Sequence, residues 1–108
     1  MIKVAILGYG TVGSGVFEII NENKELITNK AGQEIDIKYV LDLREFPGDP
    51  CENVLVHDYN IILNDPEVEV IIEVMGGLKP SYDFVKSALE AGKSVCTSKN
   101  LLQNMVQN

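Results

Sequence analysis

The sequence has no tryptophan, two cysteines, four prolines and only nine basic residues among its 108. Cys51 and Cys96 are far apart and match no metal-ligand spacing, so neither a metal site nor a disulfide framework is expected. We expect Cys96, in an apolar run, to be buried and Cys51, in a proline-rich loop, to be an exposed thiol. No apolar run is long enough to cross a bilayer, and the N-terminus lacks the regions of a signal peptide. These absences predict a cytoplasmic protein that is not inserted in a membrane.

Positive charge is also scarce, because 16 acidic residues outnumber the basic ones and the net charge is −7. Such a chain repels phosphate backbones and anionic lipid surfaces, which argues against nucleic-acid and membrane partners. It can still hold a dinucleotide, because backbone N–H groups at the start of a helix bind phosphate without help from lysine or arginine.

Hydrophobic residues make up 45% of the chain, and its length suits one domain, 1–108, that buries roughly two thirds of its unfolded surface. Strand and helix patterns alternate along it. Strands are expected at 2–7, 34–41, 53–56, 68–75 and 94–97, and helices at 12–27, 59–63 and 81–91. This alternation predicts an α/β fold with right-handed crossovers: a Rossmann-type, doubly wound parallel sheet in three layers, with strand order 3-2-1-4-5.

Several local features support these boundaries. The first helix carries a repeating set of apolar residues expected to face the sheet, namely Val12, Val16, Ile19, Ile20, Leu26 and Ile27. Asp58 is a plausible N-cap for the short middle helix. In the last helix the inner face is expected to consist of Phe84, Val85, Ala88 and Leu89. His57, the only histidine, is expected to serve the adjacent turn rather than catalysis.

A glycine pattern joins the first strand to the first helix: Gly8-x-Gly10-x-x-Gly13. In this context it predicts a site for the pyrophosphate of NAD or NADP. Gly8 permits the tight turn, Gly10 lets the pyrophosphate approach the backbone, and Gly13 lets the helix pack closely on the sheet. The helix N-terminus would add N–H donors and a partial positive charge.

Asp42 ends the second predicted strand, where a carboxylate can accept hydrogen bonds from the adenosine ribose and repel a 2′-phosphate. This favours NAD. Arg44 follows two residues later and could instead pair with a 2′-phosphate. The order of these residues leaves the choice between NAD and NADP open, with a preference for NAD.

The fourth predicted strand ends in Glu73-Val74-Met75-Gly76-Gly77. Gly76 and Gly77 would let the backbone approach the nicotinamide ribose. A carboxylate in an apolar strand is costly without partners, so Glu73 is expected to receive hydrogen bonds or to face the site.

These motifs together resemble the N-terminal domain of homoserine dehydrogenase. The resemblance covers nearly the whole chain and rests on the glycine turn, on Glu73-x-x-Gly76-Gly77 and on the stretch from Ala88 to Thr97. It implies reversible oxidation of homoserine to aspartate semialdehyde by hydride transfer to NAD(P), in the pathway to threonine and methionine. It also implies that the pyrophosphate is held by Gly8, Gly10, Thr11, Val12 and Gly13, and that the nicotinamide side is lined by Gly76, Gly77 and Thr97.

The chain departs from that family after Thr97. The family has Asn-Lys there, with the lysine beside the substrate, whereas this sequence reads Lys99-Asn100. Lys99 is the candidate catalytic residue, although a shift of one position turns its side chain away from the family direction. The substrate and dimerisation domain of the family is absent from these 108 residues, so we expect a fragment that binds cofactor without turnover, homoserine only if that domain is supplied, and a possible homo-oligomer.

Two alternatives remain. The first is the cofactor domain of a dehydrogenase like glucose–fructose oxidoreductase, which also has a helix ending in Ala-Gly-Lys before a strand. The second is a non-enzymatic nucleotide-sensing module like the regulatory domains of potassium transporters. Neither accounts for all the motifs. The first usually follows that strand with a Glu-Lys-Pro element, where this chain has Thr97-Ser98-Lys99, and the second does not explain Glu73-x-x-Gly76-Gly77.

Overall fold

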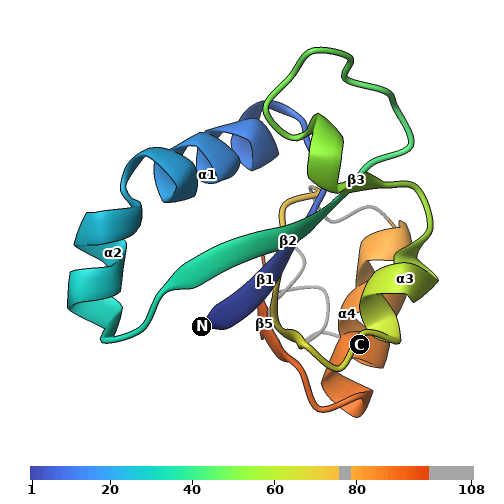
Figure 1. Ribbon diagram of the computed structural model, residues 1–108. Coiled ribbons are helices and arrows are strands. Elements are labelled where there is room, and N and C mark those ends of the chain that lie inside the picture. The colour runs from blue at the N-terminus through green and yellow to red at the C-terminus, as the bar shows by residue number, and fades with distance from the viewer. Residues whose placement is uncertain (76–78, 98–108) are drawn as a thin grey trace.

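The computed structural model describes residues 1–75 and 79–97, and Gly76, Gly77 and Lys99 lie outside these ranges. One parallel sheet has the strand order β3-β2-β1-β4-β5, which confirms the predicted topology (Figure 1). Its strands are β1 (Ile2–Leu7), β2 (Ile35–Leu41), β3 (Leu55–Val56), β4 (Val68–Glu73) and β5 (Ser94–Cys96). The α-helices are α1 (Thr11–Glu22), α2 (Lys24–Ala31), α3 (Tyr59–Leu63) and α4 (Lys79–Glu90).

The central strand β1 shows why the sheet needs a layer on each side. Its side chains alternate, so that Val4 and Ile6 enter one apolar cluster while Ala5 and Leu7 enter another. Phe17 of α1 completes the first cluster, and the second includes residues of α3 and α4. The helices therefore lie on opposite faces of the sheet, as Figure 1 shows, and the predicted three layers are confirmed.

The first helical region differs from the prediction, because it consists of two helices that meet at Asn23. The Asn23 side-chain amide donates to the carbonyl of Ile19 (2.9 Å), and its backbone closes α1. The face of α1 that packs on the sheet side is narrow and is formed by Gly13, Val16, Phe17 and Ile20. The expected apolar stripe was therefore partly wrong, since three of its members are more than half exposed: Val12, Ile19 and Leu26.

Smaller differences occur elsewhere. The last helix, α4, begins at Lys79 rather than Ser81, and Leu89, expected on its inner face, is half exposed. A turn of 3₁₀-helix (Glu52–Val54) precedes β3, which is shorter than predicted. The N-cap at Asp58 is confirmed, because its carboxylate accepts the Asn60 N–H (2.9 Å).

Both cysteine predictions were wrong. Cys51 is completely buried, and its backbone N–H donates to Asp49 within the loop between β2 and β3. Cys96 is exposed. Its neighbour Val95 packs toward the cluster shared with α4, so Cys96 points to the other face of the sheet, at the edge strand β5. In the part of the chain that the structure describes, no helix covers that side of β5.

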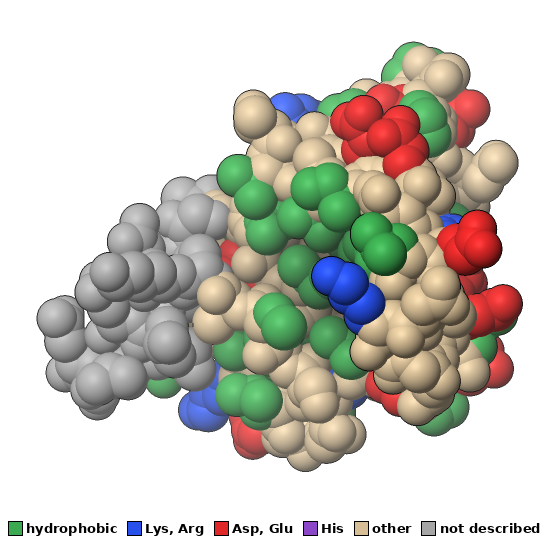
Figure 2. Space-filling view, turned by 90° about the vertical axis from the view of Figure 1, so that its left-hand side faces the viewer, with side chains coloured by type: hydrophobic (Ala, Val, Ile, Leu, Met, Phe, Trp, Pro, Cys, Tyr) green, Lys and Arg blue, Asp and Glu red, His purple; other side chains and the backbone are tan. Residues whose placement is uncertain are grey.

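Figure 2 views the molecule from the side that carries α1 and α2 in Figure 1, and it shows apolar side chains gathered near the middle of this face. Val12 and Ile19 of α1 and Leu26 of α2 are among the exposed large apolar side chains of the molecule. Within residues 1–75 and 79–97, no helix is long and apolar enough to cross a membrane.

The turn between β1 and α1 is very tight. Gly8 has a φ of 100°, which L side chains rarely adopt. A Cβ on Gly13 would lie 2.0 Å from the carbonyl oxygen of Gly8, so only glycine lets α1 approach the end of β1 this closely. The predicted roles of both glycines in the turn are confirmed.

Gly13→Ala is expected to destabilise the fold by about 3 kcal/mol, because backbone atoms must separate to admit the new methyl group. Gly15→Ala is the matched control: Gly15 lies in the same helix, and its Cβ would meet nothing within 4 Å. That variant should be neutral or more stable by about 0.5–1 kcal/mol. Urea denaturation measures both, and equal stability of the two variants would contradict the account of the turn.

Candidate functional site

The site lies where β1, β2 and β4 end, at one edge of the sheet. The Gly8 N–H donates to the carbonyl of Leu41 (2.8 Å), and the Val74 N–H donates to the carbonyl of Leu7 (3.0 Å). These bonds join the three strand ends at the glycine turn. In parallel α/β sheets this carboxyl edge, next to the point where the strand order reverses, is where ligands bind.

The N-terminus of α1 opens onto this edge without a cap. Gly10 is the N-cap residue, and no side chain supplies the usual capping hydrogen bond. The N–H groups of Thr11, Val12 and Gly13 have no partner within the helix, as in every first helical turn. A Cβ on Gly10 would meet nothing within 4 Å, so the space beside these donors is open. This arrangement suits an anion, and a pyrophosphate fits it.

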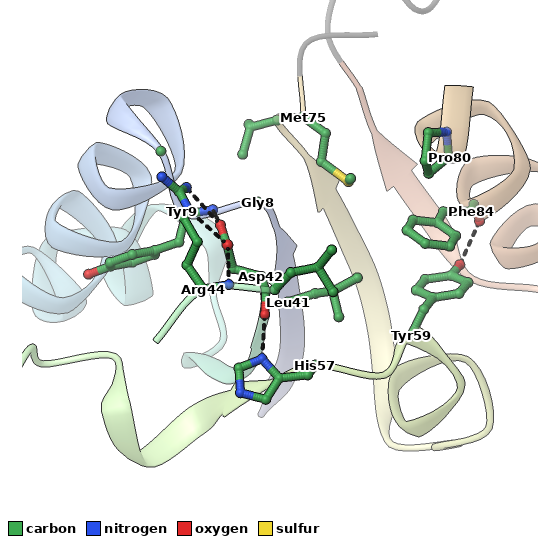
Figure 3. Close-up of a pocket in the computed structure, with 13 residues that line it drawn as sticks. Gly8, Tyr9, Leu41, Asp42, Arg44, His57, Tyr59, Met75, Pro80 and Phe84 are labelled. Atoms are coloured by element: carbon green, nitrogen blue, oxygen red, sulfur yellow. Dashed lines mark hydrogen bonds and ion pairs between the residues drawn. The ribbon is translucent and has the colours of Figure 1, made fainter. Parts of the chain in front are cut away.

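A cleft of about 540 Å³ runs along the same edge, a size typical of small-molecule sites (Figure 3). One end is polar, with Asp42, Arg44 and His57. The other is apolar and is formed by Tyr59, Met75, Pro80 and Phe84. Gly8, Tyr9 and Gly10 also line it, so the cleft is continuous with the glycine turn.

Both carboxylate oxygens of Asp42 accept two hydrogen bonds each. One of its oxygens accepts the Tyr9 N–H (2.9 Å) and an Arg44 terminal NH₂ (3.0 Å), and the other accepts the Arg44 backbone N–H (2.9 Å) and Nε (3.0 Å). The bonds from the Arg44 guanidinium lower the pKa of Asp42 to about 2. The Asp42 side chain is only 9% exposed, while that of Arg44 is 63% exposed. The structure thus brings the two predicted residues together as an ion pair.

His57 lies at the polar end between two oxygen acceptors. Its Nδ1 lies 2.6 Å from the carbonyl oxygen of Asp42, and its Nε2 lies 2.8 Å from a carboxylate oxygen of Glu45. Both partners can only accept hydrogen bonds, so both contacts are hydrogen bonds only when both ring nitrogens carry a proton. The bond to the Asp42 carbonyl, and then that to Glu45, raises the pKa of His57. His57 therefore fastens the start of the β2–β3 loop, beyond the role in its own turn expected from sequence.

Tyr9 is a site residue that the sequence reasoning missed. Its hydroxyl donates to Asp49 (2.6 Å), and its ring meets Phe17 and Phe46 edge-on, with centroids 5.8 and 4.9 Å apart. Burial, and then the bond to Asp49, raises the pKa of Tyr9. Tyr9 thereby fastens the β2–β3 loop to the glycine turn. No sequence signal identifies it, because its partners lie far along the chain.

The apolar end of the cleft was missed as well. The rings of Tyr59 and Phe84 stack with centroids 4.1 Å apart, and the Tyr59 hydroxyl donates to the Phe84 carbonyl. Phe84 was predicted only as a core residue. Its position four residues after Pro80, near the start of the last helix, was the available signal.

Glu73 has the partners that its burial requires. It is 1% exposed, and its carboxylate accepts hydrogen bonds from the Met75 N–H and from the Thr97 hydroxyl (2.7 Å). The expectation for Glu73 is confirmed. The bond from Thr97 connects the ends of β4 and β5, on the side where the nicotinamide was expected.

Known proteins share both the sequence motifs and the fold of this chain. Residues 8–107 match the family model described as "Homoserine dehydrogenase, NAD binding domain". The chain belongs to this family. It is 37% identical to the homoserine dehydrogenase of Bacillus subtilis (strain 168) over 100 residues, covering 90% of this chain and 23% of that enzyme. The homoserine dehydrogenase of Pseudomonas aeruginosa is 33% identical over 102 residues, covering 94% and 24%.

Solved structures agree. The homoserine dehydrogenase of S. aureus at pH 7.0 superposes with a TM-score of 0.80 at 40% identity, covering 90% of this chain and 26% of that one. That of Thiobacillus denitrificans gives 0.81 at 34% identity, covering 94% and 24%. The predicted family resemblance is confirmed, and the chain spans about a quarter of the length of these homoserine dehydrogenases.

His57 should titrate above the ordinary histidine pKa of about 6.5. Because the folded state favours the imidazolium, the stability that His57 contributes is present below pH 6.5 and is lost as pH rises through the raised pKa. NMR titration of its ring protons measures this. Glu45→Gln should bring the pKa part of the way down, and Glu52→Gln, which alters an exposed carboxylate in the same loop, should leave it unchanged. A wild-type pKa at or below 6.5 would contradict the account of these two contacts.

Proposed function

We propose that this chain is the cofactor-binding unit of a homoserine dehydrogenase and holds NAD(P) across the carboxyl edge of the sheet. The observation that carries the proposal is the uncapped N-terminus of α1 beside the open space at Gly10. There the pyrophosphate would accept hydrogen bonds from backbone N–H groups of the turn and of the first helical residues. The residues in contact would be Gly8, Gly10, Thr11, Val12 and Gly13.

The residues that line the cleft support a placement for the parts of the cofactor on either side of the pyrophosphate. Its polar end, with Asp42 and Arg44, would take the adenosine ribose. The adenine ring would lie on the neighbouring apolar surface, between the exposed Leu43 and the side chains of Met75 and Pro80. The nicotinamide would then extend toward Gly76, Gly77 and Thr97. The hydroxyl of Thr97, oriented by the buried Glu73, would help to shape that side.

When bound, the nicotinamide supplies the acceptor for the hydride that leaves homoserine as it becomes aspartate semialdehyde. The residues of this chain would bind and orient the cofactor. Homoserine must also be held beside the nicotinamide and shielded from water. We propose that residues outside 1–108 provide this, that Lys99 is the candidate for a catalytic contact, and that the 108 residues alone bind cofactor with negligible turnover.

Two less specific expectations belong to the same proposal. A homoserine dehydrogenase is a biosynthetic enzyme, and both cysteines here are free thiols, which suits the reducing cytoplasm. A homo-oligomer is also proposed, since the exposed apolar residues of α1 and α2 offer surface for association.

Calorimetric titration of the 108-residue chain with NAD and with NADP tests the proposal. At least one of them should bind, and Gly10→Ala should weaken that binding at least about tenfold, because its methyl group occupies the space meant for the pyrophosphate. The fold should keep its stability, since the new Cβ meets no protein atom. Gly15→Ala is the control and should bind as the wild type does. Binding of neither dinucleotide, or unchanged binding by Gly10→Ala, would reject the proposal.

A further inference from the structure

We infer that Tyr9 is a positioning residue of the dinucleotide site: its hydroxyl and its ring hold the loop that carries Asp42 and Arg44 against the glycine turn. This loop, residues 42–54, joins β2 to β3. The inference rests on the proposed function and goes further, because it makes the affinity for a dinucleotide depend on a side chain that does not contact the ligand.

The first argument is the direction of the Tyr9 side chain. Tyr9 is 6% exposed, and its ring points away from the cleft (Figure 3). Its hydroxyl donates its only proton to Asp49 (2.6 Å). Burial, and then this bond, raises the pKa of Tyr9, so the hydroxyl remains a donor. The ring and the hydroxyl therefore act on the protein and not on the ligand.

The second argument is that Asp49 organises the loop to which Tyr9 is bound. The carboxylate oxygen that accepts the Tyr9 hydroxyl also accepts the Cys51 N–H (3.0 Å). The Asp49 N–H donates to the carbonyl of Phe46 (3.1 Å), and the Asp49 carbonyl accepts the Glu52 N–H (3.0 Å). Cys51 is completely buried in the same apolar cluster as Tyr9. The bond from Tyr9 thus attaches a compact loop, and not a single residue, to the glycine turn.

The third argument is that two further contacts connect Tyr9 to the polar end of the cleft. The Tyr9 N–H donates to Asp42 (2.9 Å), and the Tyr9 ring meets that of Phe46 edge-on, with centroids 4.9 Å apart. The guanidinium carbon of Arg44 lies 5.2 Å from the centroid of the Phe46 ring. Asp42 and Arg44 both line the cleft. A loop that leaves Tyr9 therefore displaces the groups that would meet the adenosine ribose.

The cost of losing this anchor is a change of population. A loop without its anchor is in the binding position for only part of the time, and the apparent affinity falls by that fraction. The first N–H groups of α1 belong to another segment of the chain and keep their place. A ligand that reaches only the glycine turn should therefore not be affected, whereas one that carries adenosine should bind more weakly.

The test compares ADP with inorganic pyrophosphate, which reaches only the glycine turn, in NMR titrations of the 108-residue chain. Tyr9→Phe removes the hydroxyl alone. It should weaken ADP binding at least about threefold, as expected for one lost hydrogen bond, and change the affinity for pyrophosphate less than about twofold. The retained binding of pyrophosphate also shows that the variant is folded.

Tyr39→Phe is the matched control. The Tyr39 hydroxyl donates to Asp65 (2.7 Å), and neither residue lines the cleft. This variant should bind both probes as the wild type does. Because each variant loses one bond between a tyrosine and an aspartate, a loss of stability alone does not produce a difference in ADP affinity between them.

A double-mutant cycle tests whether the hydroxyl acts through Asp49. Asp49→Ala should weaken ADP binding at least as much as Tyr9→Phe does. Asp49→Asn keeps an acceptor oxygen and should recover most of the affinity that Asp49→Ala loses. In the Asp49→Ala background, Tyr9→Phe should have no further effect, and additive losses would overturn the inference.

The failures are distinguishable. Unchanged ADP affinity in Tyr9→Phe, or an equal loss in Tyr39→Phe, overturns the inference and leaves the proposed function standing. Equal losses for ADP and pyrophosphate in Tyr9→Phe would mean that the glycine turn itself is disturbed, and they overturn the inference too. If NAD, NADP and ADP all fail to bind the wild type, the proposed function falls and the inference falls with it.

Discussion

The contact between α1 and the end of β1 is the constraint on which the rest of the site depends. A methyl group on Gly13 would meet the Gly8 carbonyl at 2.0 Å, so the helix can start at this place only because Gly13 has no side chain. Gly8 contributes the turn itself, with a φ of 100°. The closeness directs the first N–H groups of α1 toward the carboxyl edge of the sheet. A Cβ on Gly10 would meet nothing within 4 Å, so the space beside these groups is open. A packing constraint thereby becomes a site for an anion.

The polar end of the cleft depends on a second set of contacts, made by the loop between β2 and β3. Tyr9 joins this loop to the glycine turn twice, through its N–H to Asp42 and through its hydroxyl to Asp49. His57 closes the loop from the side of β3. Because Asp42 and Arg44 lie at the start of this loop, their ion pair is held in place from two sides, by Tyr9 of the glycine turn and by His57 after β3. The polar end thus presents an exposed guanidinium held by a buried carboxylate, a feature that the net charge of the chain does not reveal.

The fold and the glycine turn could be predicted from sequence because their causes are local or periodic. A buried strand, a glycine turn and an amphipathic helix are each visible in consecutive residues, and the buried carboxylate of Glu73 required partners wherever they came from. The burial of Cys51 depends instead on contacts across tens of residues, and the saturation of Asp42 needs the bond from Tyr9, 33 positions away, beside those from the nearby Arg44. Cys96 is exposed because its strand lies at the sheet edge with no described helix on that side, which its apolar neighbours do not reveal. The break between α1 and α2 lies at Asn23, whose side-chain amide and backbone N–H both donate to the Ile19 carbonyl, and apolar periodicity does not reveal this local feature.

The central claim is that the N-terminus of α1 and the adjoining cleft form the dinucleotide site. Mapping of backbone amide chemical shifts by NMR during titration with NADP tests it most directly. The largest changes should fall on the amides from Gly8 to Gly13, followed by those of Asp42 to Arg44 and of Val74 and Met75. Saturable changes centred elsewhere, for example on the surface formed by α2 and the start of β2, with the glycine turn unaffected, would contradict it.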